Sequence, residues 1–278
     1  MGNVRRVGET SSLALTVLAL LVAGAGAGFA GGLFGIGGGF VVVPALVFLL
    51  PLLGASVEQT AHVAVGTSLA TIIFTSIRAT MSHAKRQAVD FEVLRSWAPW
   101  VVLGTALGTW IAYYISGSGL ALIFAIGVLA FAVYFLLPDR FAVPVFAAMP
   151  AGVPRAGLAG ALGAFSALLG IGGGTLTTLT MTVCGAPIHR AIGTAGGMGA
   201  IIAIPGTIGF ILIGLGETGL PWGSLGFVNL PAAAAIIVTS VIVAPLGVAA
   251  AHKMPPALLR RVFGIYLIVV GVTMIAKF

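Results

Sequence analysis

Stretches of apolar residues fill most of this chain, and short polar segments separate them. Ten stretches can be traced, at about residues 13 to 34, 39 to 50, 60 to 82, 96 to 115, 119 to 137, 155 to 169, 174 to 184, 189 to 214, 228 to 250 and 258 to 277. Most approach the ~20 residues that a helix needs to cross a membrane. The ~10-residue alternating strands of a membrane β-barrel are absent. The pattern predicts an all-α integral membrane protein with eight to ten hydrophobic segments.

The second stretch of each half is too short to cross the membrane. Residues 39 to 50 would form about 18 Å of helix at ~1.5 Å per residue, whereas the hydrocarbon core is about 30 Å thick. We therefore expect a short broken or re-entrant helix here and at residues 174 to 184.

Two sequence motifs occur twice, in the same order. The sequence LFGIGGG at residues 33–39 returns as LLGIGGG at 168–174, and HVAVGT at 62–67 returns as HRAIGT at 189–194. The two halves of the chain are therefore predicted to be copies of one structural unit.

A proline-rich stretch at residues 138–154 separates the two copies. Clustered prolines interrupt helices, so the repeat boundary is expected there. The prediction is a first transmembrane repeat over residues 1–147 and a second over residues 148–278.

Composition agrees with a lipid environment. Of 278 residues, 59% are hydrophobic and 7% are charged, against about 25% charged residues in a soluble domain. The net charge of +7 comes mostly from loop residues, which argues against nucleic-acid binding. The one cysteine, Cys184, excludes an internal disulfide. The first apolar stretch is longer than the ~7 to 15 residues of a signal-peptide core, so we expect a retained helix.

The charges of the loops predict how the repeats are oriented. Residues 83–95 and 252–261 are basic, whereas residues 214–227 contain no basic residue. The positive-inside rule places the first two segments in the cytoplasm and the third outside. Equivalent loops of the two copies then face opposite sides, which predicts inverted-topology repeats. Arg5 and Arg6 would lie outside, against the rule.

The glycine motifs are the predicted substrate site. A helix that restarts after glycines presents unpaired N–H groups and its positive dipole end, and glycine lets an anion approach the backbone. In inverted-repeat transporters such half-helices meet near the membrane midplane. The alternative is that GxxxG spacing only brings helices close together. The expected contacts are Gly35, Gly37, Gly38, Gly39, Gly170, Gly172, Gly173 and Gly174, with the hydroxyls of Thr67, Ser68, Thr175 and Thr194.

Two histidines open equivalent segments of the repeats. Inversion would place His62 and His189 near opposite membrane faces, where each could gate the pathway or relay protons. The alternative is that each caps a helix at the interface. All six acidic residues lie in the tail, in loops or at segment ends, so coupling through a buried carboxylate is not expected. No catalytic motif is evident, and we expect no enzyme activity, cofactor or metal.

The motifs resemble a known family. The two GIGGG motifs, followed by AVGTS at residues 64–68 and AIGTA at 191–195, resemble the TauE/SafE family of sulfite exporters. HAKRQAVD in the first half and IPGTIGFI with FVNLPA in the second extend the likeness over nearly the whole chain. The resemblance implies a multi-pass carrier in the bacterial inner membrane that exports sulfur oxyanions or organosulfonates. Pro44 follows the family pattern, whereas Leu179 stands at the equivalent place in the second copy.

The resulting hypothesis is a secondary transporter or exporter of small anions, with sulfite or organosulfonates as substrates. Its expected partners are the anion and the lipid bilayer; homo-oligomerisation is left open, and no nucleic acid is expected. One alternative is a carrier of another small anion, such as a carboxylate. The other is a non-transporting membrane subunit that scaffolds a partner enzyme.

Overall fold

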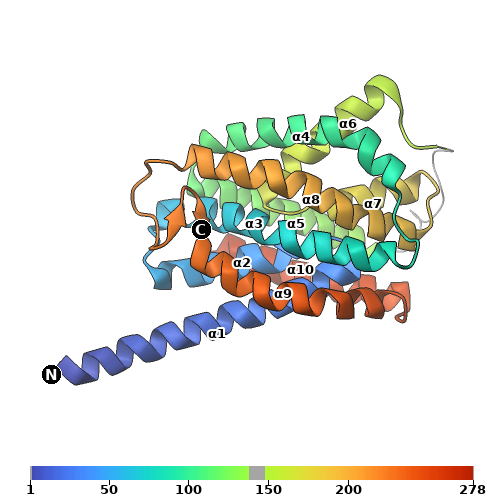
Figure 1. Ribbon diagram of the computed structural model, residues 1–278. Helices are drawn as coiled ribbons and strands as arrows, with labels where there is room; N and C mark the ends of the chain where they lie inside the picture. The colour runs from blue at the N-terminus through green and yellow to red at the C-terminus, as the bar shows by residue number, and fades with distance from the viewer. Residues whose placement is uncertain (1, 138–147, 278) are drawn as a thin grey trace.

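A computed structural model describes residues 2–137 and 148–277, which are almost entirely helical (Figure 1). The first half contains α1 (Gly2–Phe34), α2 (Gly39–Leu49), a 3-10 turn (Leu50–Leu53), α3 (Val57–Ala84), α4 (Phe91–Tyr113) and α5 (Gly117–Leu136). The second contains α6 (Gly152–Leu169), α7 (Gly174–Val183), α8 (Ile188–Ile213), α9 (Leu230–Ala251) and α10 (Pro256–Lys277). Two short antiparallel strands, β1 (Ser224–Leu225) and β2 (Val228–Asn229), precede α9.

Every predicted apolar stretch coincides with a helix, although α1 begins at Gly2, earlier than predicted. Among the described residues, six helices are long and apolar enough to cross a membrane, namely Ala14–Phe34 of α1 together with α3, α5, α6, α8 and α9. The helices α4 and α10 have similar lengths of 23 and 22 residues and carry charged residues near their first turns. The prediction of an all-α multi-pass membrane protein is confirmed.

Polar residues fix the points at which several helices begin. Each of these side chains precedes a helix and accepts a hydrogen bond from an N–H group of its first turn, the usual arrangement of an N-cap. They are Ser56 before α3, Asp90 before α4, Ser116 before α5 and Asn229 before α9.

The contacts between helices follow a two-fold pattern. Helix α1 packs on α9 and its counterpart α6 packs on α4, while α3 pairs with α8 and α5 with α10. The N–H of Ser56, before α3, donates to the carbonyl of Gly219, after α8, at 2.9 Å. Asp90, after α3, pairs with Arg190 in the first turn of α8. Helices α3 and α8 are therefore antiparallel, as predicted for inverted repeats. The repeat boundary at 147/148 adjoins residues 138–147, which lie outside the described residues.

The loops gather at two ends of the bundle. The end formed by residues 54–59, 113–118 and 214–227 carries Glu58 and Glu217, and we call it the acidic end. The turns after α3, α7 and α9 form the basic end. The two basic loops thus lie at one end, and residues 214–227, which contain Glu217 and no basic residue, lie at the other. Helix α1 starts on the side of the strands (Figure 1), so Arg5 and Arg6 remain an exception to the positive-inside rule.

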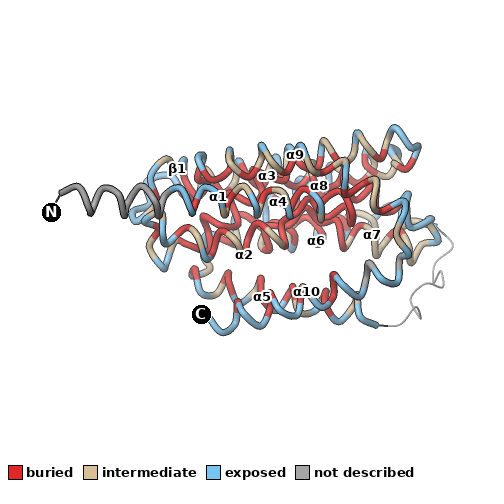
Figure 2. The backbone as a smooth tube through the Cα atoms, turned by 90° about the horizontal axis from the view of Figure 1, so that it is seen from below, coloured by how far each residue is buried: buried red, intermediate tan, exposed pale blue. Residues whose placement is uncertain are grey.

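Burial follows the layers of the bundle (Figure 2). Core side chains such as Phe40, Leu69, Phe124 and Phe210 are 0% exposed. Large apolar side chains also cover outward faces, including Leu103, Trp110, Val133, Ile242 and Leu246. An apolar exterior of this extent requires lipid rather than water around the helices.

Candidate functional site

Two glycine loops, residues 35–38 and 170–173, interrupt the helices. Helix α1 ends at Phe34 and α2 restarts at Gly39, and α6 and α7 repeat this arrangement. The backbone takes positive φ angles of 68°, 70°, 88°, 62° and 62° at Gly35, Gly37, Gly38, Gly170 and Gly173. Glycine adopts such angles without the steric cost that a Cβ atom brings, so these residues are the reason the helices break. The predicted short broken helices are confirmed.

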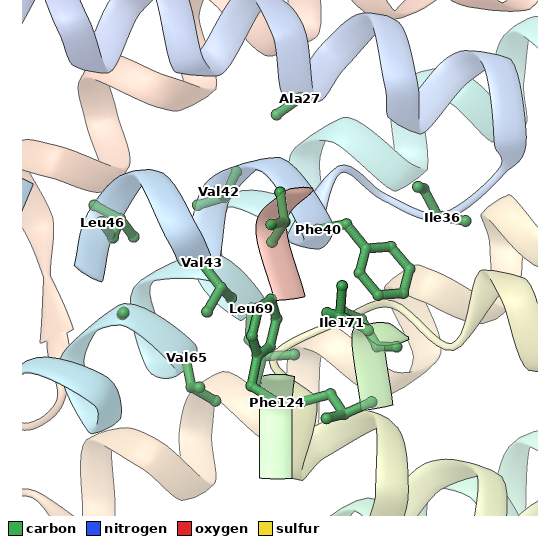
Figure 3. Close-up of a cluster of buried hydrophobic side chains, with 14 of the residues drawn as sticks. Ala27, Ile36, Phe40, Val42, Val43, Leu46, Val65, Leu69, Phe124 and Ile171 are labelled. Atoms are coloured by element: carbon green, nitrogen blue, oxygen red, sulfur yellow. The ribbon is translucent and has the colours of Figure 1, made fainter. Parts of the chain in front are cut away.

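The two glycine loops lie against each other, backbone to backbone. A Cβ atom on Gly39 would lie 2.5 Å from the carbonyl oxygen of Gly170, and one on Gly174 would collide with the carbonyl oxygen of Gly35. The loops therefore run antiparallel beside each other, and Figure 3 shows Ile36 and Ile171 in one buried cluster. The glycine motifs therefore break the helices and also allow the two loops to pack closely.

Two half-helices start at this junction. Gly38 and Gly173 occupy the N-cap positions of α2 and α7 in left-handed conformation, without a hydrogen bond from a capping side chain in the described chain. The first N–H groups of any helix have no acceptor within the helix, and its N-terminus carries a partial positive charge. Both half-helices thus direct donors toward the glycine loops, which suits an anion.

Buried hydroxyl groups surround the loops. Within the described chain, Ser76 on α3, Ser166 on α6 and Thr175 on α7 have no hydrogen-bond partner, although they are 0%, 0% and 2% exposed. The Oγ atoms of Ser76 and Ser166 lie 2.9 Å from the points where Cβ atoms on Gly37 and Gly173 would stand. A buried polar group without a partner costs about 1–3 kcal/mol, which a bound ligand would offset.

Ile72 closes the space between the loops. Its Cγ2 methyl group lies 2.7 Å and 3.1 Å from the positions that Cβ atoms on Gly37 and Gly172 would take, and its side chain is 0% exposed. The equivalent residue on α8 is Gly199, which has no side chain. Sequence reasoning missed Ser76, Ser166 and Ile72 because each lies inside an apolar stretch.

Three of the predicted hydroxyl donors already have protein partners. Thr67 Oγ accepts the N–H of Asn229 at 2.9 Å, and Thr194 Oγ accepts the N–H of Asp90 at 2.8 Å. These equivalent bonds hold the N-cap residues of α9 and α4. Ser68 donates to the carbonyl of Gly170 at 2.8 Å and so fixes a glycine loop.

His62 lies at the acidic end, beside a pocket of about 480 Å³ that Glu58 and Glu217 also line. Its ring is 6% exposed, stacks on Phe227 at 4.9 Å, and places Nε2 3.1 Å from the carbonyl oxygen of Ala112. Its buried Nδ1 atom has no partner among the described residues. The glycine loops are not among the residues that line this pocket.

His189 lies at the opposite, basic end, as the inverted repeat predicts. Unlike His62 it is exposed, and its ring stacks on that of His252 with centroids 4.7 Å apart. The ring of His83 lies 5.8 Å from that of His252. Sequence reasoning missed His83 and His252, because residues so far apart in the sequence meet only in the folded chain.

The described interior carries no formal charge. Its buried polar side chains are Ser, Thr, His and Asn, and no Asp, Glu, Lys or Arg of the described chain is among them. The described residues also contain no group of three or more His, Cys, Asp or Glu side chains placed to hold a metal ion.

Comparisons with known proteins agree with this architecture. The sequence matches the sulfite exporter TauE/SafE family over residues 20–274. A probable membrane transporter protein of Haemophilus influenzae is 35% identical over 94% of this chain and 98% of its own length. One of Methanocaldococcus jannaschii is 27% identical over 92% and 94% of the two chains, and one of Bacillus subtilis is 41% identical over 28% and 29%. No solved structure gives a significant match. The chain belongs to the sulfite exporter TauE/SafE family.

Proposed function

We propose that the protein is a secondary transporter that moves sulfite or organosulfonate anions out of the cytoplasm across the bacterial inner membrane. The observation that carries the proposal is the junction of the two glycine loops, where α2 and α7 begin. Two helix N-termini from inverted repeats meet there, as in other transporters that hold anionic groups on broken helices.

The lining of the junction fits an oxyanion better than a cation. Backbone N–H groups and the unpaired hydroxyls of Ser76, Ser166 and Thr175 are donors that can turn toward oxygen atoms. No buried carboxylate of the described residues would repel the anion. The family is named for sulfite export and its relatives are named probable membrane transporters, which supports the same conclusion.

The junction is closed by Ile72 in this structure, so passage requires a change of conformation. Inverted repeats can undergo such a change of conformation, because rocking one repeat against the other opens the centre alternately to either side of the membrane. His62 and His189 lie at the two ends of the bundle, where such a path would open. We assign them gating or proton-relay roles at the acidic and basic ends.

The test is transport by purified protein in liposomes. Radiolabelled sulfite should enter or leave saturably, with protein-free liposomes as the control, and unlabelled taurine and sulfate should compete more strongly than acetate. Strong inhibition by acetate alone would assign a carboxylate carrier instead. Absence of flux in both gradient directions, with sulfite, taurine, sulfate and acetate each used in turn as the labelled compound, would contradict a transport function and favour a scaffold subunit.

A further inference from the structure

Three histidines from three helices meet at the basic end. His83 lies in the last turn of α3, His189 in the first turn of α8 and His252 directly after α9. The ring of His252 stands between the other two, with centroids 5.8 Å from His83 and 4.7 Å from His189. This histidine cluster runs from the exposed surface to a buried position.

The inner member of the cluster has an unused nitrogen atom. His83 is 1% exposed, and its Nε2 lies 3.1 Å from the carbonyl oxygen of Gly32, three residues before Gly35. A carbonyl only accepts hydrogen bonds, so Nε2 carries the proton and Nδ1 of the neutral ring does not. That Nδ1 atom is buried without a partner in the described chain. It can accept a proton.

The surroundings of the cluster are basic. The charged side chains toward this end of the packed elements include Arg78 in α3, Lys85 and Arg86 after it, Asp90 before α4, Glu92 and Arg95 in α4, Arg190 in α8 and Lys253 after α9. The Asp90 carboxylate already pairs with Arg190 at 2.8 Å and caps α4. The cluster therefore has more cations than free carboxylates near it, and the N-terminus of α8 adds partial positive charge.

Protonation of His252 is disfavoured while the cluster holds no anion. Burial, followed by the charges of His189 and Arg86, lowers the pKa of His252. An anion beside the rings would offset this repulsion and raise that pKa again, because opposite charges favour the ionised form.

We propose that His83, His189 and His252, with Arg86, form an oxyanion-binding site at the basic end that takes up a proton together with its anion. The proton comes from solvent and binds an imidazole nitrogen. The site rests on the proposed function, since it would take the same class of anion, and the bond from His83 to Gly32 connects it to the helix that leads into the first glycine loop.

Because anion binding and proton binding are linked, the direction in which pH changes the anion affinity can be derived. In the empty site the ring of His252 is neutral above its lowered pKa, and in the anion-bound site this ring keeps its proton to higher pH. The affinity of the site for the anion should therefore rise as pH falls from the pKa of His252 in the anion-bound site to its pKa in the empty site. For one linked proton the rise is about tenfold per pH unit.

The test is calorimetric titration of the detergent-purified protein with sodium sulfate, an oxyanion that does not itself titrate near neutral pH. It is repeated in buffers of different ionisation enthalpy, which counts the protons taken up. We expect about one proton per anion near neutral pH. His252→Gln should abolish this uptake and leave the weaker, pH-independent binding at the glycine loops. Thr273→Val, an exposed change on α10, is the control. His189→Gln, also exposed, is a second variant that should fold.

The outcomes separate the two proposals. Two outcomes would overturn the histidine site and leave the proposed function standing. One is sulfite flux in liposomes without proton uptake on anion binding. The other is proton uptake that is unchanged in His252→Gln and His189→Gln. Absence of flux would overturn the proposed function, and proton-linked binding would still show the site. Loss of uptake on adding a chelator would identify a metal ion instead.

Discussion

At the scale of single residues, a glycine in these loops can be required for two reasons: its backbone conformation, or the space that a side chain would fill. Gly38 and Gly173 have left-handed backbone, so any side chain there would strain the chain whatever its effect on a ligand. Gly172 does not have a positive φ, and a Cβ atom on it would face Ile72 and Gly199 at 3.1 Å and 3.0 Å. An added methyl group at Gly172 would therefore enter the junction without forcing the backbone of that residue into a strained conformation.

Gly172→Ala should lower sulfite flux at least about tenfold, because a methyl group would enter the space between the loops. Gly157→Ala is the matched control, since nothing lies within 4 Å of a Cβ atom at that position of α6. Flux in liposomes and the unfolding temperature of both purified variants are the measurements. Equal flux in Gly172→Ala and wild type would exclude the junction as the substrate path.

Ser76→Ala should raise the KM for sulfite about tenfold, because a hydrogen bond to a charged group contributes about 1.5 kcal/mol or more. Ser76 has no partner within the described protein, so its unfolding temperature should not fall. Thr273→Val serves again as the control, because its hydroxyl bonds only within α10. A lower unfolding temperature with unchanged KM would instead assign Ser76 a structural role.

At the scale of elements, the two repeats use equivalent hydrogen bonds to position the residue before a helix. Thr67 on α3 and Thr194 on α8 each accept the N–H group of the residue that caps α9 or α4. The bonds cross between repeats, so they help to hold the repeats together. The structure therefore gives these threonines a supporting contact that the sequence motif did not reveal.

Thr67→Val should lower stability by about 1–3 kcal/mol, because the buried N–H of Asn229 would lose its acceptor. The KM for sulfite should stay unchanged in the folded fraction. Thr105→Val is the control: Thr105 is also buried, and its hydroxyl has no partner in the described chain. Unfolding temperature and flux are measured together, and a raised KM at normal stability would return Thr67 to the substrate site.

At the scale of the whole molecule, inversion gives the two ends different chemistry. His62 at the acidic end stacks on Phe227 beside a pocket, whereas its equivalent His189 joins His252 and His83 at the basic end. The positive-inside rule assigns the basic end to the cytoplasm. Under the proposed function, an anion would then load at the histidine cluster and leave past the pocket.

Labelling of single cysteines tests this orientation. In a Cys184→Ser background, Ser118→Cys should react with a membrane-impermeant maleimide on intact cells, and Lys253→Cys only after permeabilisation, because these exposed residues lie at the acidic and basic ends. The opposite pattern would reverse the orientation. Labelling of both from one side would contradict the separation of the loops into two ends.

The sequence by itself determined the membrane class, the ten helical segments, the repeat and the broken helices. Each of these depends on local properties: apolar length, glycine at positions of positive φ, and a motif copied along the chain. The bounds of the helices other than α1, which begins at Gly2, were predicted closely because polar capping residues and charged loops mark where helices end.

Only the tertiary structure decided which polar groups are free and which histidines meet. Thr67, Ser68 and Thr194 have the same chemistry as Ser76 and Ser166, and what separates them is whether another repeat or loop supplies a partner. The histidine cluster likewise joins α3, α8 and α9, which are distant in sequence. Hydrogen bonding and electrostatics act over a few ångströms in space, so packing between helices settles what local pattern leaves open.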